Sequence, residues 1–179
     1  MMPSLTFQPV TTPEQILSVE LLAREIWYEY YVPLIGKAQV DYMVAKFQSA
    51  AAMQEQIDSG YLYFLLQQEG AALGYFAAQP QPASQRLFVS KLYLHRNARG
   101  RGTGRAAMEF IEKLALERGL AHLWLTVNKG NPAVGAYQKM GLQIVESIVM
   151  DIGGGFVMDD FRMEKAITRR CNEAGNDPV

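Results

Sequence analysis

From residue 12 to 35, hydrophobic residues recur every three or four positions, the spacing of an amphipathic helix that buries one face. The run opens with Thr12-Pro-Glu-Gln15, in which the threonine can cap the helix and the proline suits its first position. Pro33 and Gly36 are the expected stop. The same spacing predicts two shorter helices, over residues 37–48 and 49–60. The first third of the chain is therefore expected to be helical.

Beyond residue 60 the pattern changes to short hydrophobic runs separated by turn residues, which is typical of β-strands. Together with a short alternating run near the N-terminus, the expected strands cover residues 5–10, 61–67, 72–78, 87–94, 121–127, 142–152 and 156–166. Helical patterns cover residues 103–118 and 131–141. Because strand 87–94 reaches strand 121–127 through a helix, these two are expected to be parallel neighbours. The order predicts an α/β (α+β) fold with a mixed, mostly antiparallel central sheet of about seven strands flanked by helices.

The segment between strand 87–94 and the next helix is rich in glycine and arginine and contains no acid. Its glycines are Gly100, Gly102 and Gly104, and its arginines are Arg96, Arg99, Arg101 and Arg105. A strand, a glycine turn and a helix N-terminus together point free backbone N–H groups and the positive end of a helix dipole at an anion. The segment is predicted to bind a polyphosphate; an ordinary glycine-rich turn with solvated arginines is the alternative.

Two common phosphate loops do not fit this segment. A Walker loop requires lysine and then serine or threonine after its last glycine, but Arg105 and Ala106 follow Gly104. A dinucleotide-binding loop requires a third glycine that is missing here, and a carboxylate after the next strand, where Asn128 stands. What remains is the spacing Arg99-x-x-Gly102-x-Gly104 directly after a strand.

This spacing resembles the coenzyme A pyrophosphate loop of the GNAT superfamily of N-acetyltransferases. The segment Asn131-Pro-Ala-Val-Gly-Ala-Tyr137-Gln-Lys-Met-Gly-Leu142 resembles the second signature of that family, N-x-x-A-x-x-x-Y-x-K-x-G-F. Its asparagine stands one position closer to the tyrosine than usual, and leucine replaces the usual phenylalanine. The order of the expected elements is similar to the GNAT fold over about residues 5–166. The two motifs, separated by one strand, independently indicate the same family.

The resemblance implies an acetyl-CoA-dependent N-acetyltransferase, without a metal, in which an amine attacks the thioester directly in a ternary complex. The residues implied in pyrophosphate binding are Arg99, Gly100, Arg101, Gly102, Thr103, Gly104 and Arg105. The backbone of Leu92 and Leu94 would pair with the pantetheine arm, and Asn131, or Asn128 in its place, would contact the coenzyme. Tyr137 would be the general acid that returns a proton to the leaving thiolate. By spacing alone, Tyr137 also fits a core position and Asn131 also fits a helix cap.

The general base is left open by the sequence. Many relatives carry a carboxylate on the strand before the loop, where this chain has Lys91 and Tyr93. The acids that could replace it are Glu25, Glu29, Asp159 and Asp160, and a water relay is a further option. Because neighbouring residues of a strand face opposite ways, at most one of the two aspartates can point into a cleft.

The acceptor pocket is expected, by the same resemblance, beside the aromatic residues at positions 27–31. The proposed substrate contacts are Trp27, Tyr31, Glu29 and Asp159. Acids in the first two helices and the last strand would favour a small cationic amine or a peptide amine beside aromatic walls; these acids are Glu20, Glu25, Glu29, Asp41, Asp159 and Asp160. A non-catalytic acyl-CoA sensor of the same fold is the alternative, because the strand carboxylate is missing. A nucleotide-binding module with a convergent glycine loop is a more distant one.

Composition limits the partners. The chain has 179 residues and a net charge of −1, so it lacks the overall field that would recruit nucleic acid or an anionic membrane. Its one cysteine, Cys171, permits no intrachain disulfide, and its histidines lack the spacing of metal ligands. No secretion signal or bilayer-length apolar run is visible, so a cytoplasmic location is expected. We expect one domain over residues 1–167 and a polar tail over 168–179, with a homodimer as one option for assembly.

Overall fold

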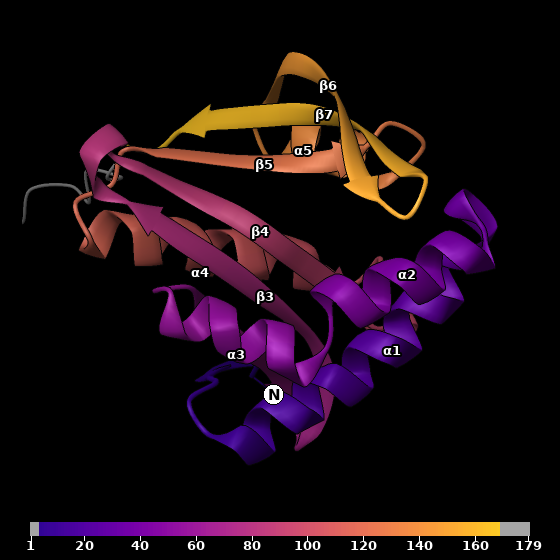
Figure 1. Cartoon of the computed structure of the whole chain (residues 1–179). Coiled ribbons are helices and arrows are strands. Elements are labelled where there is room, and N and C mark those ends of the chain that lie inside the picture. Colours follow the sequence, from indigo (N-terminus) through magenta and orange to yellow (C-terminus); the bar gives the residue numbers. More distant parts are fainter. Residues whose placement is uncertain (1–3, 169–179) are drawn as a thin grey trace, which may run out of the picture.

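The computed structural model describes residues 4–168, which are built around one twisted sheet (Figure 1). Its strands lie in the order β1-β2-β3-β4-β5-β7-β6. They are β1 Thr6–Pro9, β2 Leu62–Gln68, β3 Ala71–Gln81, β4 Arg86–Leu94, β5 His122–Asn128, β6 Gln143–Gly153 and β7 Phe156–Ala166. All neighbouring pairs are antiparallel except β4 and β5. The expected α/β fold with a mixed, mostly antiparallel sheet of seven strands is confirmed.

Helices cover both faces of this sheet. They are α1 Pro13–Ile35, α2 Lys37–Phe47, α3 Ala50–Asp58, α4 Thr103–Glu117 and α5 Ala133–Lys139. One hydrophobic cluster joins the sheet to α4 and α5, and a second joins it to α1, α2 and α3. In β2, Phe64 belongs to the first cluster and its neighbour Leu65 to the second. A strand covered on both faces reads as a continuous apolar run rather than an alternating one, which explains the sequence over residues 61–66.

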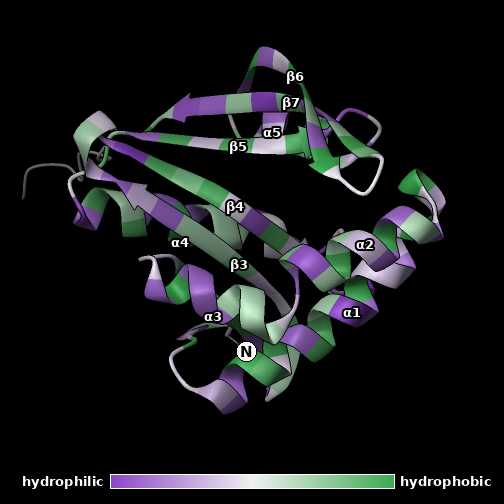
Figure 2. Ribbon diagram, viewed as in Figure 1, coloured by the Kyte–Doolittle hydropathy of each residue, from purple (hydrophilic) through white to green (hydrophobic). Residues whose placement is uncertain are grey.

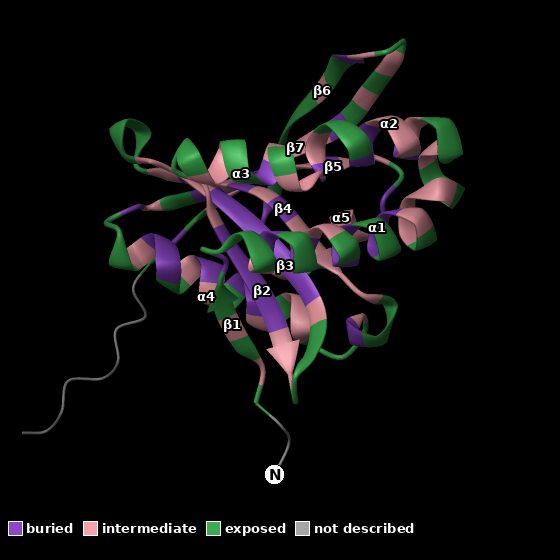
Figure 3. Cartoon of the chain, turned by 60° about the horizontal axis from the view of Figure 1, so that its bottom comes forward, coloured by how far each residue is buried: buried purple, intermediate pink, exposed green. Residues whose placement is uncertain are grey.

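The hydropathy and the burial of the residues agree with this layering. Helices α1 and α2 alternate hydrophobic and hydrophilic bands along their length, as expected of helices with one buried face (Figure 2). Buried residues concentrate in β2, β3 and β4, whereas β6, the last strand of the sheet, is mostly exposed (Figure 3). The well-packed part of the sheet therefore ends at β4 and β5, where the site lies.

The start of α1 agrees with the sequence, and its end differs in detail. The Thr12 hydroxyl accepts a hydrogen bond from the Gln15 amide at 3.3 Å, and Gln15 Oε1 accepts one from the Thr12 amide at 3.0 Å, so the capping box is present. Of the two expected stop residues, Gly36 is confirmed as the C-cap, whereas α1 continues through Pro33 to Ile35. A proline so near the C-terminus removes one intrahelical hydrogen bond without displacing later turns.

The hairpin between β2 and β3 forms at the expected turn. Glu69 and Gly70 have φ values of 51° and 80°, the left-handed conformation that a two-residue hairpin turn requires. Strand β3 is longer than expected, since it continues through Pro80. The pairing of β2 with β3 ends at Ala78, so β3 has a free edge on that side at Pro80, where a proline is tolerated.

Two predictions concern residues beyond the described part of the chain. Residues 169–179, which include Cys171 and nearly all of the expected polar tail, lie outside the described residues. Within residues 4–168, no helix is long and apolar enough to cross a membrane.

Strands β4 and β5 pair over only part of their length. Their register joins Arg86, Leu87 and Phe88 to residues 122–124, and no pairing follows. Figure 1 shows the two strands side by side at one end and spread apart at the other. Beyond Phe88, the edge of β4 that faces β5 therefore carries backbone groups without a strand partner. This divergence positions the site.

A β-bulge in β4 changes which side chains face which layer. Val89 pairs with Ala78 and Lys91 with Ala77, so Ser90 has no partner of its own in β3. In a regular strand, residues 87, 89, 91 and 93 would share one face. Leu87 and Val89 do lie in the cluster beneath α4, but Tyr93 packs with the cluster beneath α1 to α3. The bulge therefore turns Lys91 and Tyr93 toward the helices at the N-terminal end of the chain.

Candidate active site

The divergence of β4 and β5 opens a cleft of about 1010 Å³. Residues of α1, α2, β4, β5, α5, β6 and β7 line it. We call residues 99–105 its loop part; all of them except Arg101 and Thr103 line the cleft. Its aromatic part carries the rings of Trp27, Tyr30, Tyr31, Tyr93 and Trp124. The cleft thus joins segments from the start, the middle and the end of the chain.

The loop part presents free backbone and unpaired cations. Gly100 and Gly102 have φ values of 71° and 81°, and a Cβ at either would meet no atom within 4 Å, so the space before them is open. Helix α4 begins at Thr103 without a side-chain cap. Arg101 and Arg105 are exposed, and neither takes part in a salt bridge within residues 4–168. These groups offer N–H donors and positive charge to an anion.

Arg99 differs from these arginines because its guanidinium is already bound. Its Nε donates to the Leu94 carbonyl at 3.0 Å, and its terminal nitrogens donate to the Glu29 carboxylate at 3.1 and 2.7 Å. The guanidinium also lies 4.5 Å from the centre of the Tyr30 ring. The hydrogen bonds and charge of Arg99 lower the pKa of Glu29. Arg99 therefore ties α1 to the loop, and Glu29 is not among the residues that line the cleft.

Leu92, Leu94 and Gly104 lie along the wall that leads from β4 into α4, and all three line the cleft. The two leucine side chains pack beneath the sheet with the cluster around α4. A Cβ at Gly104 would lie 3.5 Å from the Leu94 side chain, which is ordinary contact. Gly104 therefore has less need to be glycine than Gly102, whose backbone is left-handed.

Asn131 joins α5 to α1. Its Oδ1 accepts hydrogen bonds from the Tyr30 hydroxyl at 2.7 Å and from the Ala133 amide at 2.9 Å, and its Nδ2 donates to the Tyr31 hydroxyl at 3.4 Å. The side chain is buried and lines the cleft. Asn128 also lines the cleft, and its Oδ1 accepts from the Gly130 amide at 2.9 Å. The N-cap of α5 is Pro132, so Asn131 is not the helix cap expected from the sequence, although its Oδ1 accepts from the first amide of the helix. Its bonds to Tyr30 and Tyr31 make it a link between distant segments, which its sequence position did not reveal.

Tyr137 lies on α5 and lines the cleft. Its ring packs against the cluster beneath α4 and α5, in keeping with its helical spacing. Burial, with a smaller effect of Tyr30, raises the pKa of Tyr137 to about 12. Its hydroxyl is therefore protonated at neutral pH and available as a proton donor.

The predicted aromatic contacts do meet at the cleft. Trp27 and Tyr31 stack with their ring centres 4.3 Å apart. The ring of Tyr93 packs edge-on against Trp27, with the ring centres 5.2 Å apart. Tyr30 and Trp124 line the same space. Tyr30 belongs to the aromatic residues 27–31 expected at the pocket, whereas the sequence analysis did not name Trp124, which β5 brings to the cleft.

The two neighbouring aspartates of β7 face opposite ways. Asp159 is bound by Lys129 at 2.5 Å and does not line the cleft. Asp160 is buried and does line it. Burial raises the pKa of Asp160 to about 6, although a hydrogen bond with Thr126 acts in the other direction. Asp160 is therefore the acid of the pair that a substrate can reach.

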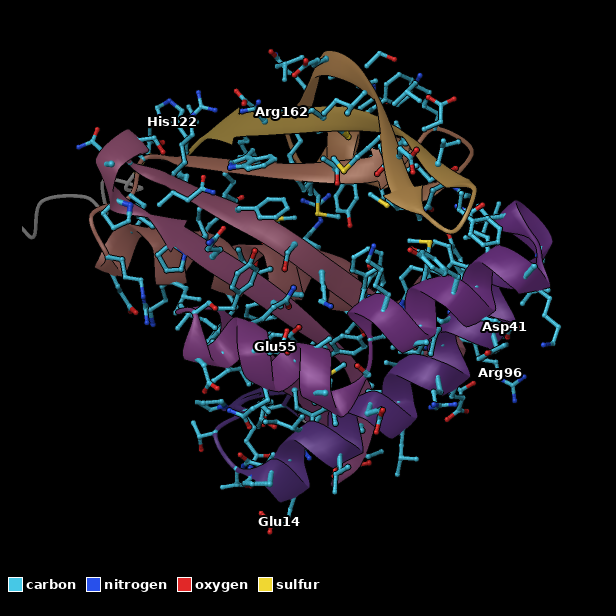
Figure 4. The ribbon with its side chains drawn as sticks, in the orientation of Figure 1. Glu14, Asp41, Glu55, Arg96, His122 and Arg162 are labelled. Atoms are coloured by element: carbon cyan, nitrogen blue, oxygen red, sulfur yellow. The ribbon has the colours of Figure 1, made fainter. Side chains whose placement is uncertain are left out.

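The other acids expected around the acceptor are engaged elsewhere. Glu20 accepts a hydrogen bond from the Ala50 amide, and Glu25 pairs with His95 at 2.8 Å. Asp41 binds Lys37 and Tyr28 and lies at the outer end of the helical layer (Figure 4). Of the six acids named from the sequence, the cleft lining contains only Asp160. The cleft therefore contains far fewer acidic side chains than the sequence suggested.

Lys91 lies on β4 and is 4% exposed. Its Nζ donates to the Phe47 carbonyl and to Gln48 Oε1, the latter at 3.3 Å. Burial lowers the pKa of Lys91 to about 7, a shift that corresponds to several kcal/mol in favour of the neutral amine. The bulge at Ser90, which hydrophobic patterning cannot show, places it on the cleft wall.

Residues 4–168 contain no group of three or more histidine, cysteine, aspartate or glutamate side chains that could hold a metal ion.

Comparison with known proteins gives one match to a protein family. The model of the family described as "Acetyltransferase (GNAT) family" matches residues 23–142. No curated protein matches the sequence.

Several solved structures share the fold at low identity. A PaiA N-acetyltransferase from Thermoplasma acidophilum in complex with coenzyme A aligns with a TM-score of 0.71 and 17% identity, covering 91% of this chain and 99% of that one. The ribosomal-protein-S18-alanine N-acetyltransferase of Escherichia coli gives 0.68 and 17%, covering 98% and 100%. An acetyltransferase from Thermus thermophilus gives 0.67 and 21%, covering 93% and 99%.

Proposed function

This chain belongs to the acetyltransferase (GNAT) family, and from that premise we propose that it transfers the acetyl group of acetyl-CoA to a primary amine. One observation carries the proposal. The loop part, with its open left-handed glycines and the uncapped start of α4, shares one cleft with Tyr137 and Asp160. A cleft that combines an anion-binding loop with two side chains able to transfer protons fits an acyl donor that carries a polyphosphate group.

The residues present fit coenzyme A. Open backbone at Gly100 and Gly102 and the first N–H groups of α4 would hold the pyrophosphate, with Arg101 and Arg105 adding charge. The free edge of β4 at Leu92 and Leu94 would pair with the amide groups of the pantetheine arm. A backbone N–H of the same edge would stabilise the oxyanion; loss of one such donor costs on the order of 3 kcal/mol.

Proton transfer is assigned to two side chains. The amine nitrogen forms a bond to the thioester carbon while the carbon–sulfur bond breaks. The Tyr137 hydroxyl would donate its proton to the departing sulfur, because its raised pKa keeps it protonated. Asp160, ionised above about pH 6, would accept the proton that the amine gives up, directly or through water. Of the base candidates named from the sequence, Asp160 is the one that the cleft exposes.

Roles for the remaining predicted residues follow from their contacts. Asn131, tied to Tyr30 and Tyr31, would position the aromatic part and is favoured over Asn128 as the link to the coenzyme. Arg99 and Glu29 would act on the loop through their ion pair rather than on a ligand. The acceptor is proposed to be a small amine or a peptide amine whose nitrogen lies near Asp160. The homodimer, the cytoplasmic location and the lack of nucleic-acid or membrane partners stay predictions.

Thiol release from acetyl-CoA with a panel of primary amines tests the proposed function. We expect release that depends on amine, together with saturable binding of acetyl-CoA and coenzyme A by calorimetry. Tight acetyl-CoA binding without release for any amine would favour the acyl-CoA sensor instead. Binding of ATP in preference to coenzyme A would indicate a nucleotide-binding module.

A further inference from the structure

The charge of Lys91 has no counterion in the described part of the protein. None of the salt bridges within residues 4–168 involves it, and its Nζ is held by two uncharged oxygens, from Phe47 and Gln48. A buried cation is stable only when it is paired or gives up its proton. Yet the side chain lines an open cleft, so a partner can come from outside.

The groups around Lys91 are neutral on every side. Tyr63 of β2 lies with its ring centre 5.8 Å from Nζ, and Tyr75 of β3 donates to the same Gln48 oxygen at 2.8 Å. Tyr93 follows on the same face of β4. Burial raises the pKa of all three tyrosines well above the neutral range. From the α2–α3 junction, only the Phe47 carbonyl and the Gln48 amide face the ammonium.

We propose that Lys91 forms a subsite for a carboxylate carried by the acceptor, which makes the substrate an amine with both an acidic group and an aromatic or large apolar body. The inference rests on the proposed function for the identity of the acceptor. Phe47, whose carbonyl accepts from Lys91, and the rings of Tyr61 and Phe88 line the same cleft and suit such a body. Asp160, the carboxylate of the lining, is available for the amine. The lining also contains Arg99, Arg105, Lys139 and Arg162, but Lys91 is the buried cation among them and Asp160 the buried anion. A buried cation and a buried anion in one aromatic cleft match an amino-acid-like molecule.

The subsite has a defined pH dependence. Without a partner, the pKa of Lys91 is lowered to about 7, so the side chain is mostly neutral at pH 8. A bound carboxylate favours the ammonium form and raises that pKa, so binding at pH 8 takes up close to one proton. Carboxylate affinity should therefore fall about ten-fold per pH unit from pH 7 upward. In this range Asp160 stays ionised and the tyrosines stay neutral, which leaves Lys91 as the titrating group.

Calorimetry with 3-phenylpropionate, in the presence of coenzyme A, tests the subsite apart from catalysis. This probe has the aromatic body and the carboxylate but no amine that titrates. At pH 8 we expect proton uptake, seen as a dependence of the heat on the ionisation enthalpy of the buffer. Lys91→Met keeps the length and apolar contacts of the side chain and should weaken binding about ten-fold or more. Lys113→Met removes an exposed lysine of α4 and serves as the matched control.

Acetyl transfer then tests the acceptor class. Phenylalanine and its β-amino homologue should be acetylated with a higher kcat/KM than phenethylamine, and Lys91→Met should remove that preference while sparing phenethylamine. Equal losses for all three amines would overturn the subsite and make Lys91 a general participant in the reaction. Unchanged 3-phenylpropionate binding in Lys91→Met, or binding without proton uptake, would also overturn it. If no amine is acetylated but the carboxylate probe behaves as expected, the proposed function fails and the subsite stands.

Discussion

The loop part and the aromatic part of the cleft are built in opposite ways. The loop part comes from seven consecutive residues, and it offers backbone groups and exposed arginines. The aromatic part is assembled from α1, β4 and β5, and two charged groups of the same cleft, Lys91 on β4 and Asp160 on β7, are buried. In the loop part a ligand meets groups that water already solvates. In the aromatic part it meets groups whose pKa values burial has shifted.

This difference indicates a division of labour. Solvated cations and free N–H groups bind a polyphosphate strongly whatever the rest of the ligand is, because the charge of the phosphates dominates. Buried groups with shifted pKa values discriminate between ligands, because each must be matched by a charge or left neutral. We therefore expect changes in the loop part to act on coenzyme affinity, and changes in the aromatic part to act on turnover and acceptor choice.

The largest expected effect is the loss of coenzyme binding in Gly102→Val. The φ of Gly102 is 81°, and the added side chain would fill the open space that the pyrophosphate needs. Coenzyme A affinity should fall by about 100-fold or more by calorimetry, the scale of several lost hydrogen bonds to a charged group.

Gly119→Val is the matched control for this prediction. Gly119 follows α4, has φ 71° and likewise has no atom near its Cβ position, so both variants carry a similar strain of about 1–3 kcal/mol. Only the Gly102 variant should lose coenzyme binding. A folded Gly102→Val protein that binds coenzyme A normally would refute the loop assignment.

A smaller effect, on turnover alone, is expected for Tyr137→Phe. The change removes the hydroxyl and keeps the packing of the ring, so coenzyme affinity should not change, while kcat should fall about 100-fold, within the range of general-acid contributions. Because the pKa of Tyr137 is about 12, its titration should not appear in the neutral pH–rate profile. Tyr42→Phe is the control, because the Tyr42 hydroxyl donates to the Ile152 carbonyl outside the cleft. Wild-type turnover in Tyr137→Phe would return this tyrosine to a packing role.

The smallest effect, about ten-fold in kcat/KM, is expected for Asp160→Asn. The wild-type rate should rise as the pH passes upward through about 6, since the carboxylate form accepts the proton, and this limb should vanish in the variant. Because the pKa of Asp160 is raised on folding, its charge destabilises the folded state at neutral pH, so the variant should not melt at a lower temperature at pH 7. Asp159→Asn, at the neighbouring position bound by Lys129, should keep both the rate and the limb. The same limb in both variants would show that another group titrates.

The sequence by itself determined the elements and the loop part. The capping box at Thr12, the turn at Glu69-Gly70 and the glycines at residues 100–104 are local features, because each depends on the backbone preference of a few adjacent residues. The seven strands and the parallel pair β4 and β5 followed from hydrophobic period and crossover length. The family signature was readable for the same reason, since both of its motifs are continuous in the chain.

Only the tertiary structure decided which side chains face the aromatic part. The bulge at Ser90 reverses the alternation of β4, so Lys91 and Tyr93 turn to a face that the period-two pattern would not assign to them. The orientation of β7 selects Asp160 over Asp159, and ion pairs remove Glu29 and Asp41 from the cleft. These outcomes depend on register and on partners far away in the chain. A pattern read along the sequence carries no information on either, because it records neighbours in the chain and not neighbours in space.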